Sequence, residues 1–440
     1  MGRAVDIAFY ASRFAGVTDR LRGILANGLP NSALSIADQI VASATTFIAG
    51  ALIGRMCSKE EFGLYTIGFS LLTLLMTVQA SLIATPFMIR IPGLKNDEAK
   101  LFSGSSLIHQ LAFGVSVSVC VAIAGGISVI DNAAMGQALI ALGAVLAVLL
   151  LRDYVRQTCF ARLAYVQALT LDVLLALLQI GGLAALYLSG NLHAWTAFLV
   201  LGLACAITAL HWAMITRGER RIDITNVSRD FRNSWSSGKW LLASGLVWAI
   251  SMNLYAWIVA AFHGTASAGS WAAALGVMTL INPLMLGVQN YLGPRIMHAN
   301  AEGGINRLRR TVRDAGLMFF ALLFVFTVAM YFCGDLLVST IYGAKYAGNG
   351  TLVVLLSLNA TILTVGFAVS RGLFALQLAS IDFYVNFVAL ACFMLFGIAL
   401  VRSIGPVGAA LAQIATNALA TLVRTIAFMR VSKRLALEAA

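Results

Sequence analysis

The feature that most limits how this chain can fold is a series of apolar segments, each long enough to cross a membrane. The first two lie between Ser35 and Arg90 and are joined by a short polar corner from Ser58 to Tyr65. Each has about 20 residues, which as a helix spans a hydrocarbon core of roughly 30 Å. This stretch therefore predicts two membrane helices connected by a tight turn.

Composition argues against the alternative that these segments are core helices of a soluble protein. Of the 440 residues, 60% are hydrophobic and only 11% are charged. Soluble domains carry about 25% charged residues. A chain with less than half that fraction has too few charged side chains to cover a surface that faces water. We therefore expect an all-α polytopic membrane protein.

More apolar segments follow the opening pair and bring the expected total to about twelve transmembrane helices. They lie near Gly104–Ile130, Ala133–Leu151, Leu163–Leu188, Leu192–Thr216, Trp240–Phe262, Ala268–Tyr291, Ala315–Cys333, Gly350–Ser370, Phe383–Val401 and Pro406–Phe428. The most charged connection, residues 217–239, falls near the midpoint of the chain. We interpret it as a basic cytoplasmic linker between an N-lobe (32–216) and a C-lobe (240–430), each with six transmembrane helices, and residues 431–440 as a cytoplasmic tail.

The positive charges indicate which side of the membrane each loop faces. Under this topology, all but four of the 30 Lys and Arg residues fall on one side. The four on the other side are Arg55, Lys59, Lys345 and Arg402. Because Lys and Arg accumulate in cytoplasmic loops, we expect both termini in the cytoplasm. The net charge of +12 lies in these short loops, so we expect no nucleic-acid partner.

The N-terminal segment, residues 1–31, has an amphipathic pattern. Its apolar residues recur at steps of three and four and so share one helical face. They are Ile7, Tyr10, Phe14, Val17, Leu21 and Ile24. The pattern is typical of a helix that lies on the inner membrane surface; the alternative is a basic tail without fixed structure.

The pattern of the first half returns in the second. The opening hairpin resembles Trp240–Arg295, where a second apolar segment again ends with Pro and Arg. Phe160 precedes Asp172 at the same spacing at which Phe374 precedes Asn386. Because each half has an even number of spans, the halves have the same orientation and form a parallel repeat. Such repeats place a substrate cavity at the interface between them.

Three blocks of sequence carry a resemblance to a known family. They are Arg55 with Glu61–Tyr65, Ile341–Tyr346 and Gly405–Ala412. In this order they resemble the polysaccharide-exporter branch of the MOP superfamily, the Wzx-type flippases of O-antigen and exopolysaccharide repeat units, over about residues 32–430. The resemblance implies a bacterial inner-membrane protein with two six-helix lobes in a V around a central cavity. It also implies alternating access and a polyprenyl-diphosphate-linked oligosaccharide as substrate.

Five arginines at span ends are candidates for binding the diphosphate. They are Arg55, Arg90, Arg295, Arg371 and Arg424. A diphosphate is anionic, and the guanidinium is a permanently charged fork that matches phosphate oxygens. The alternative for each arginine is that it reaches toward lipid headgroups.

Polar residues of the last span add to the candidate cavity. Gln413, Asn417, Thr421 and Arg424 recur at steps of four, four and three, and so form one continuous polar face. Such a face either lines a water-filled cavity or packs against other helices. We take Gln413 and Asn417 as candidates for binding the substrate sugars.

Two acidic residues inside spans are candidates for ion coupling, because intramembrane charges are costly and usually functional. Asp38 is either a cavity-wall or cation-site residue or a hydrated carboxylate at the membrane edge. Asp172 lies deeper, where a desolvated carboxylate can carry a proton. The alternative for Asp172 is a structural hydrogen bond to a neighbouring helix.

Motifs for covalent chemistry are not found. The sequence has no GxxxxGK[ST], HExxH or GxSxG pattern, and its five histidines lack metal-ligand spacing. We expect no enzyme activity, no catalytic residue, no cofactor and no metal. The expected partners are the lipid-linked oligosaccharide and membrane lipids, with a polysaccharide polymerase and chain-length proteins as further candidates. The alternative function is a MATE-type drug or metabolite exporter coupled to protons or sodium, which the excess of cations over acids at span ends disfavours.

Overall fold

The computed structural model describes residues 31–438, and these residues are almost entirely helical. The amphipathic helix expected over residues 1–31 therefore lies outside the described part, apart from Asn31. Helices dominate because a chain in hydrocarbon must satisfy every backbone N–H and C=O internally.

The first half of the described chain forms six long helical segments. One of them is composite: α3 continues through a π-helical turn, η1, into α4 and the short η2. The bounds are α2 (Asn31–Met56), α3 (Lys59–Gln79), η1 (Ala80–Ala84), α4 (Thr85–Arg90), η2 (Ile91–Gly93), α5 (Asn96–Ser128), α6 (Ala133–Ala161), α7 (Tyr165–Leu188) and α8 (Ala194–Ile215).

The second half follows the same plan with longer, bent helices. A π-helical turn, η6, here joins α12 to α13. The bounds are η3 (Arg217–Glu219), α9 (Ile224–Met278), η4 (Thr279–Ile281), α10 (Asn282–Tyr342), η5 (Ala344–Tyr346), α11 (Gly350–Ala375), α12 (Ala379–Cys392), η6 (Phe393–Gly397), α13 (Ile398–Ile404) and α14 (Pro406–Glu438).

Glycines mark the points where the two longest helices turn back. The backbone of Gly264 inside α9 has φ of 77°, and that of Gly304 inside α10 has φ of 65°. Glycine adopts such left-handed conformations without the steric penalty of a Cβ atom. Eleven segments of residues 31–438 are long and apolar enough to cross a membrane, and the break at Gly264 divides one of them, Leu241–Ile281, which makes twelve. The expected all-α architecture of about twelve spans is confirmed.

The expected linker, residues 217–239, is helical from Ile224 onward and forms the first turns of α9. The Asp223 side chain caps this helix by accepting a hydrogen bond from the backbone N–H of Thr225 at 3.0 Å. The connection between the two halves is therefore a short segment before Asp223, and the charged residues after it lie on a helix.

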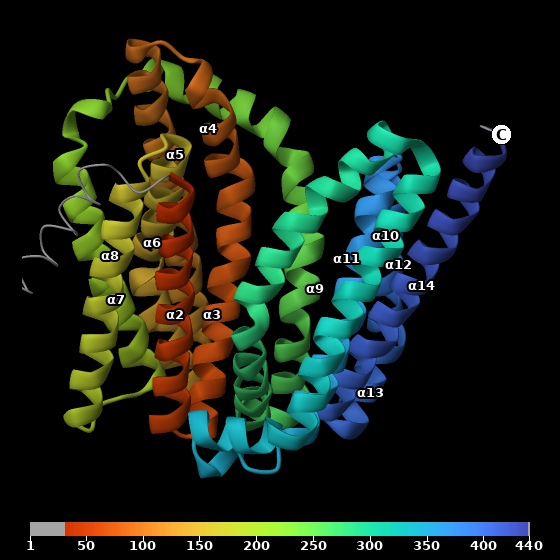
Figure 1. Cartoon of the computed structure of the whole chain (residues 1–440). Coiled ribbons are helices and arrows are strands. Elements are labelled where there is room, and N and C mark those ends of the chain that lie inside the picture. The colour runs from red at the N-terminus through yellow and green to blue at the C-terminus, as the bar shows by residue number, and fades with distance from the viewer. Residues whose placement is uncertain (1–30, 439–440) are drawn as a thin grey trace, which may run out of the picture.

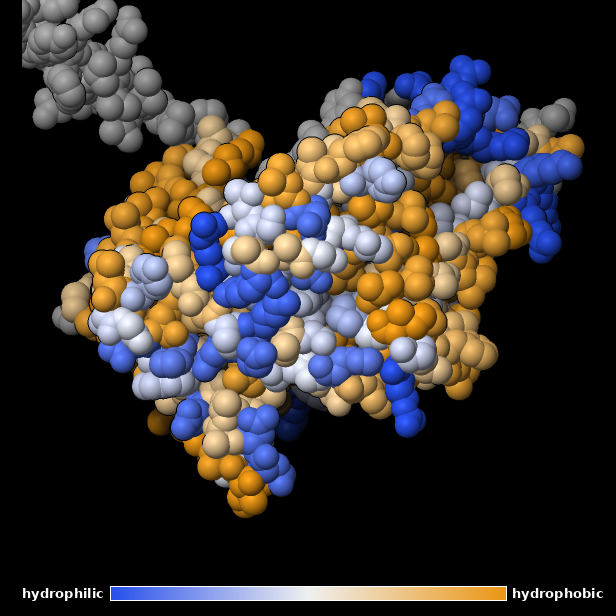
Figure 2. Space-filling model, turned by 90° about the horizontal axis from the view of Figure 1, so that it is seen from below, coloured by the Kyte–Doolittle hydropathy of each residue, from blue (hydrophilic) through white to orange (hydrophobic). Residues whose placement is uncertain are grey.

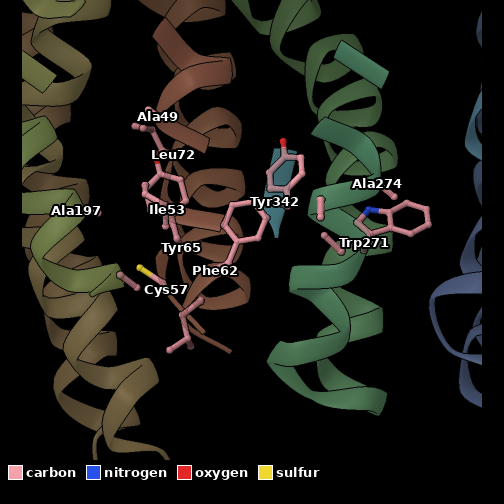
Figure 3. Close-up of a cluster of buried hydrophobic side chains, with 14 of the residues drawn as sticks. Ala49, Ile53, Cys57, Phe62, Tyr65, Leu72, Ala197, Trp271, Ala274 and Tyr342 are labelled. Carbon is pink, nitrogen blue, oxygen red and sulfur yellow. The ribbon is translucent and has the colours of Figure 1, made fainter. Parts of the chain in front are cut away.

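The two lobes meet at one end and diverge toward the other (Figure 1). We call the end with the α2–α3 turn at Cys57 the clasp end, and the end with the connection at Arg217–Glu219 the linker end. One hydrophobic cluster near the clasp end contains residues of both lobes, such as Ile53 and Phe62 with Trp271 and Tyr342. Figure 3 shows Phe62 and Tyr342 side by side in this cluster. Toward the linker end, each lobe has hydrophobic clusters of its own.

The seam between α3 and α9 holds the lobes together along its length. Near the clasp end, a Cβ on Gly63 would lie 1.8 Å from the carbonyl oxygen of Thr265, so only glycine permits this approach. Midway, the indole N–H of Trp257 donates a hydrogen bond to Ser70 Oγ at 2.5 Å. Near the linker end, a Cβ on Gly238 would lie 2.6 Å from the carbonyl oxygen of Ser81.

At the clasp end, each lobe supplies a cation to a helix C-terminus of the other. The Arg55 guanidinium at the end of α2 donates to the carbonyl of Thr340 in the last turn of α10. Lys345, just after α10, donates to the carbonyl of Arg55 at 3.1 Å and to that of Cys57. The last carbonyls of a helix lack intrahelical partners and carry partial negative charge, so both cations are well placed. Figure 2 shows hydrophilic residues gathered in the middle of this face.

The same region encloses the thiol of Cys57, which is buried in the turn between α2 and α3. Its Sγ lies 3.4 Å from the carbonyl oxygen of Leu192. Burial raises the pKa of Cys57 to about 11, so at neutral pH the side chain is a thiol with little thiolate.

Candidate functional site

The N-lobe holds a cluster of two acids and two arginines between α2, α6 and α7. Asp38 of α2 is fully buried and Asp172 of α7 is 2% exposed. Arg152 and Arg156 lie one turn apart on α6, and this spacing places both guanidinium groups on one face of the helix. One alternative for Asp38 was a hydrated carboxylate at the membrane edge. The side chain is instead buried among protein atoms.

Arg156 bridges the two acids. Its Nε donates to Asp172 Oδ2 at 2.9 Å, and its Nη2 is paired with Asp38 Oδ2. Arg152 Nη2 is paired with the other oxygen of Asp172, Oδ1. Asp172 thus accepts hydrogen bonds from two guanidinium groups. Asp38 and Arg156 are 118 residues apart in the sequence. The structural alternative for Asp172, a bond to a neighbouring helix, is present in the form of these ion pairs.

A second set of polar groups lies on the adjacent face of α6. The Asp153 carboxylate accepts from Gln79 Nε2 of α3 at 3.2 Å and from Gln157 Nε2 at 2.7 Å. Gln110 Nε2 of α5 is 3.5 Å from Gln79 Oε1. Asp153 therefore has amide partners, and it also interacts electrostatically with Arg152 and Arg156.

The C-lobe holds a smaller charged cluster between α12 and α14. Arg424 Nε donates to Asp382 Oδ1 at 2.7 Å, and Arg424 Nη2 donates to Asn386 Oδ1 at 2.6 Å. Asn386 Nδ2 in turn donates to Asp382 Oδ2 at 3.1 Å. Arg424 therefore donates to one carboxylate oxygen and one amide oxygen of α12.

The polar face expected on the last span packs against neighbouring helices. Asn417 Nδ2 donates to Asn359 Oδ1 of α11 at 2.8 Å, and Thr421 Oγ1 is 3.4 Å from the carbonyl oxygen of Ile362. Gln413 is buried, and its Oε1 has no hydrogen-bond partner within residues 31–438. Of the two alternatives left by the sequence, packing describes Asn417 and Thr421, while Gln413 keeps an acceptor available.

The remaining candidate arginines are spread over both lobes. Arg90 at the end of α4 lies over the Phe102 ring at 4.2 Å and 3.5 Å from Asp230. Arg371 near the end of α11 lies over the Phe367 ring at 4.6 Å. Arg295 is exposed on α10, and Arg55 is at the clasp end. The structure does not bring the five predicted arginines into one cluster.

Sequence reasoning found Asp38, Asp172 and Arg424 but missed their charged partners in both clusters. Arg152 and Arg156 were counted among the cytoplasmic cations, and Asp382 was not considered. A usable signal existed, because two arginines four residues apart at the end of an apolar helix share one face. Which acids they meet depends on how α2 and α7 are rotated, and hydropathy carries no information on that rotation.

A groove of about 400 Å³ lies at the linker end of the N-lobe, between α2, α7 and α8. Its lining is mainly apolar, including Leu34, Val166, Leu171 and Ile215, with His211. It has no cationic side chain that would bind a phosphate. In the described part of the chain, no group of three His, Cys, Asp or Glu side chains is arranged to hold a metal ion.

A family model of polysaccharide biosynthesis proteins matches residues 94–349, which is more than half of the chain. No curated protein sequence matches the chain significantly.

Solved structures of MOP superfamily transporters share the fold. An inward-facing multidrug resistance MATE family transporter superposes with a TM-score of 0.74 at 14% identity, covering 92% of this chain and 100% of that one. The lipid II flippase MurJ, in an inward closed conformation, superposes with a TM-score of 0.72 at 12% identity, covering 92% and 91%. An outward-facing MATE family transporter reaches 0.58 at 15% identity, covering 93% and 97%. The lobes are thus arranged more like those of the inward-facing structures.

Proposed function

The chain belongs to the family of polysaccharide biosynthesis proteins, and from this premise we propose that it flips polyprenyl-diphosphate-linked oligosaccharide repeat units from the inner to the outer leaflet of a bacterial inner membrane. The observation that carries the proposal is the family match on a two-lobed MOP transporter fold. The chain is a multi-pass membrane protein with twelve spanning segments within residues 31–438. Alternating access by its lobes would move a polar headgroup without covalent chemistry. We infer that it is not an enzyme.

The charge of the lobes supports an anionic headgroup. Arg90, Arg295, Arg371 and Arg424 all lie toward the linker end, which we propose faces the cytoplasm together with both termini. Arg55 lies at the clasp end. We propose that the diphosphate first meets the arginines of the linker end, with Gln413 and Asn417 nearer the sugars, and passes Arg55 after the clasp end opens.

Deletion and rescue test this function. In a strain lacking the gene, lipid-linked repeat units should accumulate in the inner leaflet, and expression of this chain should clear them. An assay in which the sugar is accessible to an external glycosidase only after flipping distinguishes the leaflets. If the deletion strain accumulates no repeat units, the flippase proposal is wrong.

Asp38 and Asp172 are proposed as the groups through which an ion gradient acts on export. Their placement in one cluster that connects α2, α6 and α7 supports the proposal, because a change of charge there alters contacts among three helices. Export by Asp172→Asn should lose its dependence on the gradient. Unchanged dependence in this variant would exclude Asp172 from coupling.

A MATE-type drug or metabolite exporter coupled to protons or sodium is the second candidate. The TM-score of 0.74 with a MATE family transporter favours it. Expression in a drug-sensitive strain decides between the two, since an exporter raises the tolerated drug concentration and a flippase does not. The proposed protein partners, a polysaccharide polymerase and chain-length proteins, belong to the flippase reading only.

A further inference from the structure

The N-lobe cluster carries an inference about which cation neutralises its acids. We propose that the guanidinium of Arg156 is a tethered cation that occupies the place between Asp38 and Asp172 where a soluble metal cation would otherwise bind. The inference deepens the proposed coupling role of these two acids, because it excludes Na⁺ as the ion held between them while Arg156 is in place.

Both acids of the cluster are buried away from solvent. Asp38 is fully buried and Asp172 almost so. Two ionised carboxylates cannot be held together in a medium of low polarity unless opposite charge lies between them. A bound metal ion can supply that opposite charge, and so can the side chain of a neighbouring Arg or Lys.

Arg156 contacts one oxygen of each acid, Asp38 Oδ2 through Nη2 and Asp172 Oδ2 through Nε. A single planar fork therefore fills the space between the two carboxylates. Nη2 also lies 3.4 Å from Gln39 Oε1, so this nitrogen has two oxygen acceptors, one from Asp38 and one from Gln39.

Arg152 pairs with the remaining oxygen of Asp172, so the two acids face two arginines. Asp153 is the other acid in this part of α6, and its carboxylate is held by Gln79 and Gln157. The set of Asp38, Asp172, Arg152 and Arg156 is neutral when ionised. Asp38 Oδ1 has no hydrogen-bond partner within residues 31–438. The position between the two carboxylates is occupied by the Arg156 guanidinium, and a Na⁺ bound there would have to displace it.

Removal of Arg156 should therefore create a cation requirement. In Arg156→Gln, the acids retain only Arg152, and the vacated space is lined by oxygens of Asp38, Asp172 and Gln39. Hard cations such as Na⁺ take oxygen ligands of this kind. A ligand that binds only the folded state stabilises it by RT ln(1 + [L]/Kd), so the melting temperature rises with the concentration of the ligand.

The experiment compares melting temperatures of the purified chain in NaCl and in choline chloride of equal ionic strength. We use a pH of about 8, at which carboxyl groups are normally ionised. The wild type should melt at the same temperature in both salts. Arg156→Gln should melt lower in choline and regain about 2 °C or more in NaCl. The triple variant Asp38→Asn, Arg156→Gln, Asp172→Asn should show no such gain.

Two further variants control for a general loss of stability. Arg156→Lys keeps a tethered charge and should show no NaCl-specific gain. Arg162→Gln breaks the pair with Glu219 at the linker end and should also show none. The proposal is overturned if Arg156→Gln does not respond to Na⁺, or if the wild type responds and Asp38→Asn abolishes that response. If Arg156→Gln cannot be purified, the wild-type comparison alone decides. Since no substrate is present, these results are independent of the flippase assay.

Discussion

The two lobes have the same helical plan but neutralise their buried charges differently. In the N-lobe, α6 supplies two guanidinium groups to acids on α2 and α7. In the C-lobe, α14 supplies one guanidinium to an acid and an amide on α12. The first arrangement ties three helices together through ion pairs, and the second ties two.

The repeat places the two clusters at related positions. Aligning Phe160 with Phe374 pairs Asp172 with Asn386 and Arg152 with Gly366. A Cβ on Gly366 would lie 3.6 Å from Arg424 Nη1. The guanidinium of the C-lobe therefore reaches close to where the N-lobe has Arg152, but it comes from a different helix. The fold therefore determines where a charge can be held, and each half supplies that charge from its own sequence.

The largest expected effect comes from Asp172→Ala. This change leaves two guanidinium groups without their shared acid, and removal of one partner of a buried ion pair costs about 3–5 kcal/mol. The matched change Asp382→Ala should cost about 1.5–3 kcal/mol, because Arg424 retains Asn386. Melting temperatures of the two purified variants measure the difference. Equal losses of stability would mean that both lobes depend equally on their acids, and the proposed difference between the lobes would be wrong.

Arg424→Lys should come next. An ammonium cannot contact Asp382 and Asn386 with the two separate nitrogens of a fork, so we expect a loss of about 1.5–3 kcal/mol and reduced export. Clearance of accumulated repeat units measures export, with membrane levels checked in parallel. The control is Arg430→Lys on the exposed side of the same helix, which should stay within about 0.5 kcal/mol of the wild type. Full export by Arg424→Lys would show that the charge alone suffices in the C-lobe.

Asn417→Ala tests the uncharged part of the C-lobe. It leaves the buried Asn359 carbonyl without the donor that it has at 2.8 Å, which costs about 1–3 kcal/mol. The double variant Asn359→Ala, Asn417→Ala removes both partners and should recover part of that loss. A double-mutant cycle on melting temperature gives the interaction energy. Strictly additive losses would indicate that this contact is not a hydrogen bond that matters to the fold.

The smallest expected effect is that of Gly366→Ala. The new Cβ would lie 2.6 Å from Thr421 Oγ1, a side-chain atom that can rotate away, so we expect a loss of about 1 kcal/mol. Pairing this change with Thr421→Ala, which removes the obstructing atom, should restore stability. If the pair is no better than the single change, the crowding involves more than Thr421, and the space next to Arg424 is more tightly packed than the position of Thr421 indicates.

Much of the architecture could be predicted because the relevant signals are local. The length of each apolar segment and the recurrence of Pro with Arg at span ends depend only on neighbouring residues. They gave about twelve spans in two like-oriented halves, as the structure has them. The apolar segments that end at Phe262 and begin at Ala268 predict a turn between these residues, and the structure has its break at Gly264.

Which charged side chains form pairs could not be predicted, because it depends on how the helices pack. Asp38 and Asp172 are visible in the sequence as acids inside apolar segments, yet their partner Arg156 appeared there as one more cytoplasmic cation. Pairing depends on the rotation and tilt of three helices that are distant in sequence, and these follow from side-chain packing across the whole lobe. The many membrane crossings in two related halves follow from the amino-acid sequence alone, because the preference of apolar side chains for hydrocarbon acts residue by residue. The network of α2, α6 and α7 was decided by packing, because an ion pair forms only where the fold brings two side chains within contact distance.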